Sequence, residues 1–165
     1  MKKILSLLGA ITLIGTSITN LVACNHFTQQ ELEKIKEDNS KIINDIKLEW
    51  MAPQEKPFKQ LDNKYYFVVW RGNKKDDWRI IKLIHNELKI GKIFDKYNQY
   101  TLELRQETGY PFDFTLYVRY SSSWAPADWE SDNGTYFKSV YRWNSDKNIP
   151  NLVVDSKTGE IKDES

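Results

Sequence analysis

The sequence predicts an α+β protein in which an N-terminal amphipathic helix is followed by an antiparallel β-meander sheet of about six strands. Three observations lead to this prediction. Apolar residues recur at helical spacing between residues 28 and 50, hydrophobic alternation with a period of two begins after residue 64, and short polar loops separate the alternating segments. Sequential strands joined by short loops favour antiparallel neighbours.

The helix is predicted over residues 28–50. Thr28 and Glu31 stand at capping-box spacing, so the helix should begin at Thr28. One face carries apolar side chains, namely Leu32, Ile35, Ile42, Ile43 and Ile46. This face can dock on the protein's own sheet, form a short coiled coil with Asn39 at a seam position, or belong to a loose stalk.

A change of composition separates the helix from the alternating region. Residues 51–63 contain Pro53 and Pro57 among charged and amide side chains, which is typical of a linker. We therefore expect a fragment from about residue 55 to fold alone. The expected organisation is a signal segment at 1–23, a tether with helix and linker at 24–63, and a β-rich globular domain at 64–165.

The β-rich region contains several alternating segments. The clearest is 112–120, where apolar residues alternate with Asp, Thr, Tyr and Arg. Residues 88–94 are ambiguous around Gly91. The predicted strands are 65–70, 78–84, 100–105, 112–120 and 135–143, with a C-terminal hairpin of 152–154 and 160–161.

The first residues have the pattern of an export signal. Lys2 and Lys3 precede an uncharged run from Ile4 to Ile18, which is short for a stable membrane span and diluted by Ser, Thr and Gly. The segment Leu21-Val22-Ala23-Cys24 follows. It resembles the lipobox of bacterial lipoproteins, in which an apolar residue and two small residues precede a cysteine.

The resemblance implies a specific modification. The signal would be cut before Cys24, and a diacylglyceryl group on the Cys24 thiol would attach the chain to the outer face of the cell membrane. Two acyl chains hold a protein durably, whereas one chain holds it marginally. Cys24 is the single cysteine, so no intramolecular disulfide can form. A plain secretory signal followed by a free cysteine is the alternative.

Composition limits the classes of partner. Removal of Lys2 and Lys3 leaves 22 of the 24 basic residues and all 23 acidic residues, which gives a formal charge of −1. Because the chain has no excess of positive charge, a broad nucleic-acid-binding face is not expected. Lys is much commoner than Arg, and Ile and Asn are frequent. With the lipobox, this bias resembles uncharacterised surface lipoproteins of mollicutes, spiroplasmas in particular, a resemblance that implies no known activity.

Few residues suggest enzyme chemistry. His26 and His85 stand apart from each other and from any cysteine pair, so neither a metal site nor a cofactor is expected. Residues 121–123 are three serines without the Gly-x-Ser-x-Gly pattern of a nucleophile elbow. The sequence therefore favours a protein without catalytic activity.

The segment 121–134 is the most unusual part of the chain. It is long for a connection within a compact domain, and it contains Trp124 and Trp129, with Tyr136 just beyond it. Exposed aromatic rings there can contact a sugar face, a lipid headgroup or a protein. Alternatively, both Trp rings fold back over the open end of the sheet and complete the core.

The same segment carries three acids, Asp128, Glu130 and Asp132. Two of them could serve as the carboxylate pair of a hydrolase, or all three could form a calcium loop together with Asn133. Both alternatives are weaker than the binding role. We expect a membrane-anchored, non-enzymatic interaction module that contacts an external protein or glycan; a small-molecule or glycan-binding lipoprotein is second and a carboxylate-based hydrolase third.

Overall fold

The computed structural model describes residues 27–106, 113–121 and 127–164. Within these ranges the chain forms one α-helix, α1 (Gln29–Asn39), a short 3-10 helix, η1 (Pro53–Glu55), and eleven strands. The strands are β1 (Lys41–Ile43), β2 (Ile46–Trp50), β3 (Tyr65–Trp70), β4 (Arg79–Ile84), β5 (Lys92–Tyr97), β6 (Tyr100–Gln106), β7 (Phe114–Tyr120), β8 (Ala127–Asp128), β9 (Phe137–Trp143), β10 (Leu152–Val154) and β11 (Ile161–Asp163).

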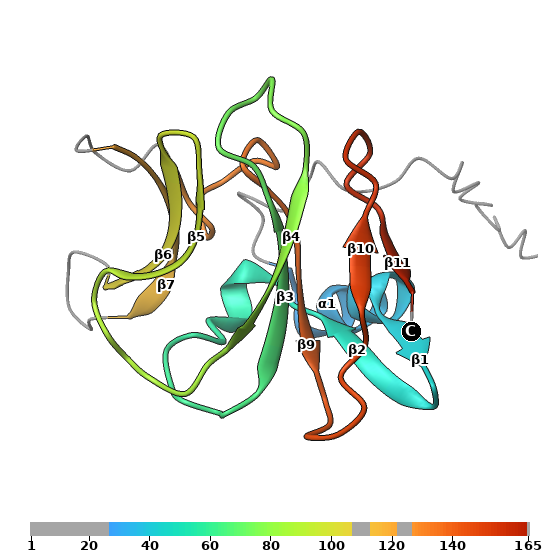
Figure 1. The fold of residues 1–165 in the computed structure, drawn as a ribbon. Coiled ribbons are helices and arrows are strands. Elements are labelled where there is room, and N and C mark those ends of the chain that lie inside the picture. The colour runs from blue at the N-terminus through green and yellow to red at the C-terminus, as the bar shows by residue number, and fades with distance from the viewer. Residues whose placement is uncertain (1–26, 107–112, 122–126, 165) are drawn as a thin grey trace, which may run out of the picture.

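The strands form three sheets. Sheet A has the order β1-β2-β9-β3-β4, sheet B has the order β5-β6-β7-β8, and β10 pairs with β11 in a separate hairpin. All neighbouring strands that pair are antiparallel. Figure 1 shows sheet B on one side of sheet A, and α1 with the β10–β11 hairpin on the other.

Sheet A therefore has a core on each face. The inter-sheet core, between sheets A and B, includes Met51, Phe58, Tyr66, Val68, Trp70, Leu102, Leu104, Leu116, Val118 and Val140. The outer core, under α1 and the β10–β11 hairpin, includes Leu32, Leu48, Trp50, Phe67, Val69, Tyr141, Trp143, Leu152 and Ile161. Alternate residues of β3 supply both cores because successive side chains of a strand point to opposite faces.

The predicted fold class, a helix followed by a single meander of about six strands, is wrong. The described residues form a mostly β structure with three sheets, and the order of sheet A is not sequential. β9 lies between β2 and β3 and pairs with both. It can occupy the centre because it is apolar on both faces, with Phe137 and Val140 on one and Tyr141 and Trp143 on the other.

The helix is also shorter than the predicted 28–50. Its start is confirmed, since Thr28 and Glu31 form the reciprocal capping box. It ends at Asn39, whose side-chain amide donates to the Ile35 carbonyl at 2.7 Å. Residues 41–50 then form the β1–β2 hairpin around Asn44 and Asp45, which both have positive φ, as a two-residue hairpin turn requires.

The segment expected as a linker is part of the folded body. Met51, Ala52 and Phe58 are buried, and the Met51 N–H donates to the Val140 carbonyl at 2.9 Å. β2 belongs to the same sheet as β3. The structure therefore shows no break between residues 46–63 and the strands that follow.

Most of the predicted strands are found in place. The alternating segments expected at 65–70, 78–84, 100–105, 112–120 and 135–143 correspond to β3, β4, β6, β7 and β9, and the C-terminal hairpin to β10 and β11. The ambiguous region 88–94 contributes to β5, which pairs with β6 through an irregular register between Ile93 and Asp95.

Candidate functional site

Two grooves flank α1, and they differ in their polar groups. The glutamate groove, of about 830 Å³, lies between α1, β2 and η1. Its charged side chains are Glu33, Lys36, Glu37, Lys47, Glu49 and Glu55. The lysine groove, of about 380 Å³, lies between α1, β9 and β11. Both volumes fall within the range of about 300–1,000 Å³ typical of small-molecule sites.

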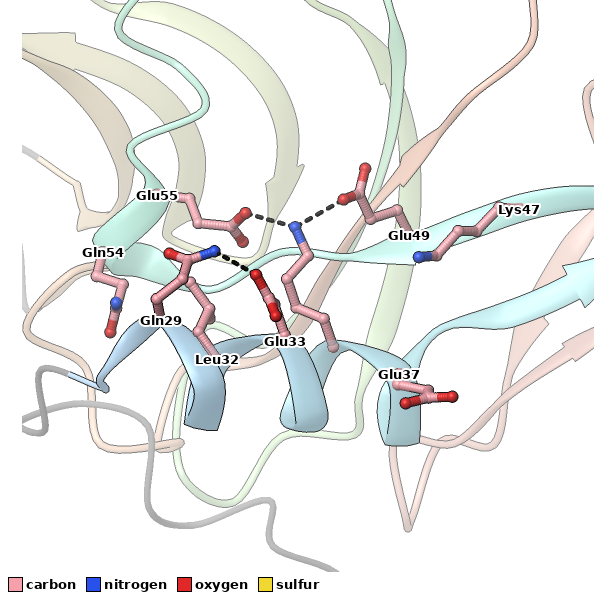
Figure 2. A pocket seen from close by; sticks show the side chains of 9 residues that line it. Gln29, Leu32, Glu33, Glu37, Lys47, Glu49, Gln54 and Glu55 are labelled. Atoms are coloured by element: carbon pink, nitrogen blue, oxygen red, sulfur yellow. Dashed lines mark hydrogen bonds and ion pairs between the residues drawn. The ribbon is translucent and has the colours of Figure 1, made fainter.

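An ion-pair cluster occupies the glutamate groove. The Lys36 ammonium lies 2.6 Å from Glu49 Oε1 and 2.5 Å from Glu55 Oε1. In Figure 2 dashed lines run from Glu49 and from Glu55 to the same nitrogen, while Glu37 points away from them. Glu55 also accepts the backbone N–H of Ala52 at 2.8 Å. Lys36 therefore fastens α1 to both β2 and η1.

Glu49 is the centre of this cluster. Its Oε2 accepts from Arg142 Nη2 at 2.7 Å and from Asn144 Nδ2 at 3.2 Å. Burial by itself would raise the pKa of the Glu49 carboxyl, but the hydrogen bonds from Lys36, Arg142 and Asn144 outweigh it and lower the pKa to about 2. The pKa of Lys36 is raised, because its two glutamate partners outweigh its own desolvation.

The electrostatics of the glutamate groove favour a structural role. Glu49 stays ionised and Lys36 stays protonated across the physiological range, so neither is poised to exchange a proton near pH 7. Arg142 Nη1 also lies 3.9 Å from Asp62, which in turn accepts from the Tyr66 hydroxyl at 2.6 Å. The cluster thus links α1, β2, β9 and β3.

The lysine groove has a different character. Phe27, Trp50 and Tyr141 contribute apolar surface to its lining, although Trp50 and Tyr141 are mostly buried. Three cations line it, Lys41, Lys138 and Lys162, against two anions, Asp38 and Glu160. A concave wall of aromatic edges with a few polar groups is the arrangement expected of a small-molecule site.

Two acids of the 121–134 segment are used in local structure, and the third, Glu130, lies 3.2 Å from the Lys56 ammonium. The Asp132 carboxylate accepts backbone N–H groups from Gly134 at 3.1 Å, Tyr136 at 3.1 Å and Phe137 at 2.9 Å. Asp128 accepts from both the backbone and the hydroxyl of Ser131. The hydrolase and calcium hypotheses required these oxygens to face a ligand, whereas here they shape the turn that leads into β9.

Trp129 of the same segment lies within the described residues and is buried. Trp129 is 5% exposed and contacts Phe58, with ring centroids 5.8 Å apart. Tyr136 is half-buried and packs against the inter-sheet core. Trp124 lies outside the described residues. A ring as buried as Trp129 cannot serve as a platform for a sugar, so this residue acts as core, as the alternative hypothesis states.

His85 is buried rather than arranged for metal binding. It is 1% exposed and packs edge-on against Phe58 and Tyr66. Neither ring nitrogen has a partner in hydrogen-bonding geometry. Burial lowers the pKa of His85, and this shift is opposed by Asp62 and by backbone groups of Gln60 and Phe58, which lie near the ring without meeting hydrogen-bonding geometry. In the described part of the chain no group of three or more His, Cys, Asp or Glu could hold a metal ion.

Sequence reasoning missed the residues that define the two grooves. The predicted helix 28–50 includes both Lys36 and Glu49, whereas in the structure Glu49 lies on β2, opposite Lys36 on α1. The Asn44-Asp45 pair between β-branched residues was an available signal for the turn that separates them. Lys138 was recognised only as part of a strand, and no local pattern marked it as a groove residue.

Cys24 and the preceding segment lie outside the described residues. Among residues 27–106, 113–121 and 127–164, no helix is both long enough and apolar enough to cross a bilayer. The proposed export signal is therefore supported by sequence alone.

Comparison with known proteins gives one informative similarity. No family model matches the chain, and no solved structure matches it. A stretch of 139 residues, 84% of the chain, is 27% identical to "Uncharacterized protein ORF1" of Spiroplasma virus SpV1-R8A2 B. The match spans 13% of that relative's length. It is consistent with a spiroplasma-related origin, and its name carries no activity.

Proposed function

We propose that the chain is a lipid-anchored protein on the outer face of the cell membrane, where its β-rich body acts as a non-enzymatic interaction module. The observation that carries this proposal is the segment Leu21-Val22-Ala23-Cys24, placed directly after a basic start and an uncharged apolar run. The similarity to a Spiroplasma virus protein is compatible with the mollicute resemblance of the sequence.

The geometry supports a body that sits close to the bilayer. Both backbone polar groups of Phe27 bond the Gln54 side chain, at 2.9 Å and 3.1 Å, so the folded body already includes Phe27. Three extended residues span about 10 Å at most, which is the longest tether available between Cys24 and Phe27. The proposed module therefore works at the membrane surface and not at the end of a long stalk.

The direct test follows lipid on Cys24. Cells expressing the chain are grown with radioactive palmitate, and wild type is compared with Cys24→Ala. We expect label on the wild type alone and a native N-terminus at residue 24. Because the chain has a single cysteine, no second thiol can accept the lipid. Equal labelling of both proteins, or a mature chain that still begins at Met1, would refute the anchor.

The interaction role has two forms. In the first, the body contacts an external protein or glycan through its surface. In the second, it binds a small molecule or a glycan unit in a pocket, and the lysine groove favours this form because it combines aromatic edges with uneven charge. The two forms differ in the size of ligand that they require. A binding screen of the protein against monosaccharides and against whole glycans distinguishes them, because only the pocket form binds a monosaccharide.

A further inference from the structure

Lys138 is displaced from the regular ladder of β9. In the pairing with β3, Val69 lies opposite Ser139 and Trp70 lies opposite Phe137, so Lys138 has no Cα partner of its own. It is the extra residue of a β-bulge. Bulges redirect side chains and are common next to binding sites. Here the bulge lets Phe137 face the inter-sheet core while Lys138 turns toward the lysine groove.

The stem of Lys138 is held in place by Gly159. A Cβ atom at Gly159 would lie 2.8 Å from Lys138 Cγ and 3.2 Å from Trp78 Cδ1, so any larger residue would push the lysine away. Gly159 also has φ +76°, in the left-handed region that favours glycine. The β10–β11 turn therefore fits closely against the aliphatic part of Lys138 and positions its ammonium group.

This ammonium group is partly desolvated and has no ion-pair partner among the described residues. Desolvation lowers the pKa of Lys138, Glu160 opposes the shift and the positive charge of Arg71 adds to it. Arg71 itself is engaged, with Nε 2.6 Å from the Thr135 carbonyl and its guanidinium 4.2 Å over the Trp78 ring. A partly buried charge without a counter-ion is unfavourable, and an anionic ligand would relieve it.

We propose that the lysine groove binds a small organic anion, a sugar acid or sugar phosphate, with Lys138 as the residue that pairs with the acidic group. The half-buried Phe27 ring would contact the apolar face of such a ligand, and the Asp38 carboxylate on α1 can accept hydrogen bonds from its hydroxyl groups. The proposal rests on the ligand-binding form of the proposed function, but it does not require the lipid.

The test titrates the purified full chain, in detergent, with glucuronate, glucose 6-phosphate and neutral glucose by isothermal titration calorimetry. We expect at least one of the two anions to bind with a dissociation constant below about 1 mM, and glucose to bind far more weakly. Added salt should weaken the interaction. If neither anion binds in this range, or if glucose binds equally well, the proposal is wrong.

Matched variants locate the site. Lys138→Gln keeps the stem that packs on Gly159 but removes the charge, and it should weaken anion binding at least about tenfold. Glu160→Gln removes the competing carboxylate and should strengthen binding. Lys47→Gln, in the glutamate groove, is the control and should leave binding unchanged. Equal binding by wild type and Lys138→Gln would overturn the assignment even if the anion binds elsewhere.

The result is independent of the anchor. If the chain takes up no palmitate but binds an anion in a way that depends on Lys138, the lipid anchor is refuted and the proposed anion site stands. If Cys24 carries palmitate but no anion binds, the anion site is refuted and the lipid anchor stands. Thermal unfolding of Lys138→Gln provides the structural control, because replacing a partly desolvated, unpaired charge should not lower stability.

Discussion

The two faces of sheet A are built in different ways. Two hairpins whose strands are close in sequence, β3 with β4 and β6 with β7, supply most of the inter-sheet core, and residues of β9 with Met51, Phe58 and Trp129 complete it. The outer core is closed by α1 from one end of the described chain and by the β10–β11 hairpin from the other. Local alternation thus predicts most of the strands that line the first core, whereas both covers of the second core come from segments that meet sheet A only in the folded protein.

The strongest test of this comparison deletes α1 and the β1–β2 hairpin. A fragment of residues 55–165 lacks Leu32, Leu48 and Trp50, so the outer face of β9 and β3 would be exposed to water. We expect it to lose cooperative thermal unfolding and to bind a hydrophobic dye, whereas a chain beginning at residue 25 melts in one transition. The sequence alone suggested that this fragment folds. Cooperative melting of the fragment would show that the outer core is dispensable.

A matched pair of substitutions compares the cores directly. Trp70 in the inter-sheet core and Trp143 in the outer core are both fully buried, and each indole N–H has an acceptor, Asp95 or the Lys147 carbonyl. Truncation of either to Ala should cost about 3–5 kcal/mol in the free energy of unfolding, measured with urea. A much smaller cost for Trp143→Ala would mean that the outer core is loosely packed.

A smaller effect is expected for the ion pairs that attach α1. Glu49→Gln leaves Lys36 and Arg142 short of one acceptor and should cost about 2 kcal/mol at pH 7. Because the pKa of Glu49 is lowered to about 2, its contribution is complete above the ordinary value of 4.5 and is lost as pH falls from 4.5 toward 2. Urea unfolding as a function of pH should show a larger loss in wild type than in Glu49→Gln, which keeps the lowered pKa values of Asp113 and Asp155.

Glu37→Gln is the control for that experiment. Glu37 lines the same groove but points away from the ion pairs in Figure 2. Its substitution should change the free energy of unfolding by less than about 0.5 kcal/mol. If Glu37→Gln destabilises the protein as much as Glu49→Gln does, general surface charge and not the specific cluster holds α1.

The smallest effect is expected at His85, which belongs to the inter-sheet side. Burial lowers the pKa of His85 below its ordinary value of 6.5, so the folded protein favours the neutral ring. Stability should be complete above pH 6.5 and should decline as pH falls below it toward the lowered pKa. His85→Phe should abolish this decline between pH 7 and 5. A wild type whose stability is flat in that interval would contradict the expectation.

The sequence predicted the elements whose signals are local. The capping box of Thr28 and Glu31 marks the helix start, and alternation marks β6 and β7. The end of the helix was missed because the spacing of Ile42, Ile43 and Ile46 fits a helix as well as a hairpin. In the hairpin, Ile42 is 68% exposed, which a helix docked by its apolar face would not predict.

The candidate site was predictable only in part. The sequence marks Trp129 as a candidate contact residue, but the ring is buried, and its burial depends on Phe58, about seventy residues earlier in the chain. The orientation of Lys138 depends on how β9 aligns with β3, and a bulge in a distant pairing leaves no mark in the local pattern. Such features arise from tertiary pairing, so they become visible only in the structure.

The central place of β9 also sets an order for folding. β2 and β3 acquire their shared neighbour only when residues 137–143 are available, and the Glu49–Arg142 pair closes across 93 residues of chain. Sheets dominated by such long-range pairings fold slowly, on the order of milliseconds to seconds, because the loop-closure entropy is lost before most contacts form. A nascent chain emerging from its N-terminus can form the β1–β2 hairpin early, but sheet A stays open until residue 143 has emerged.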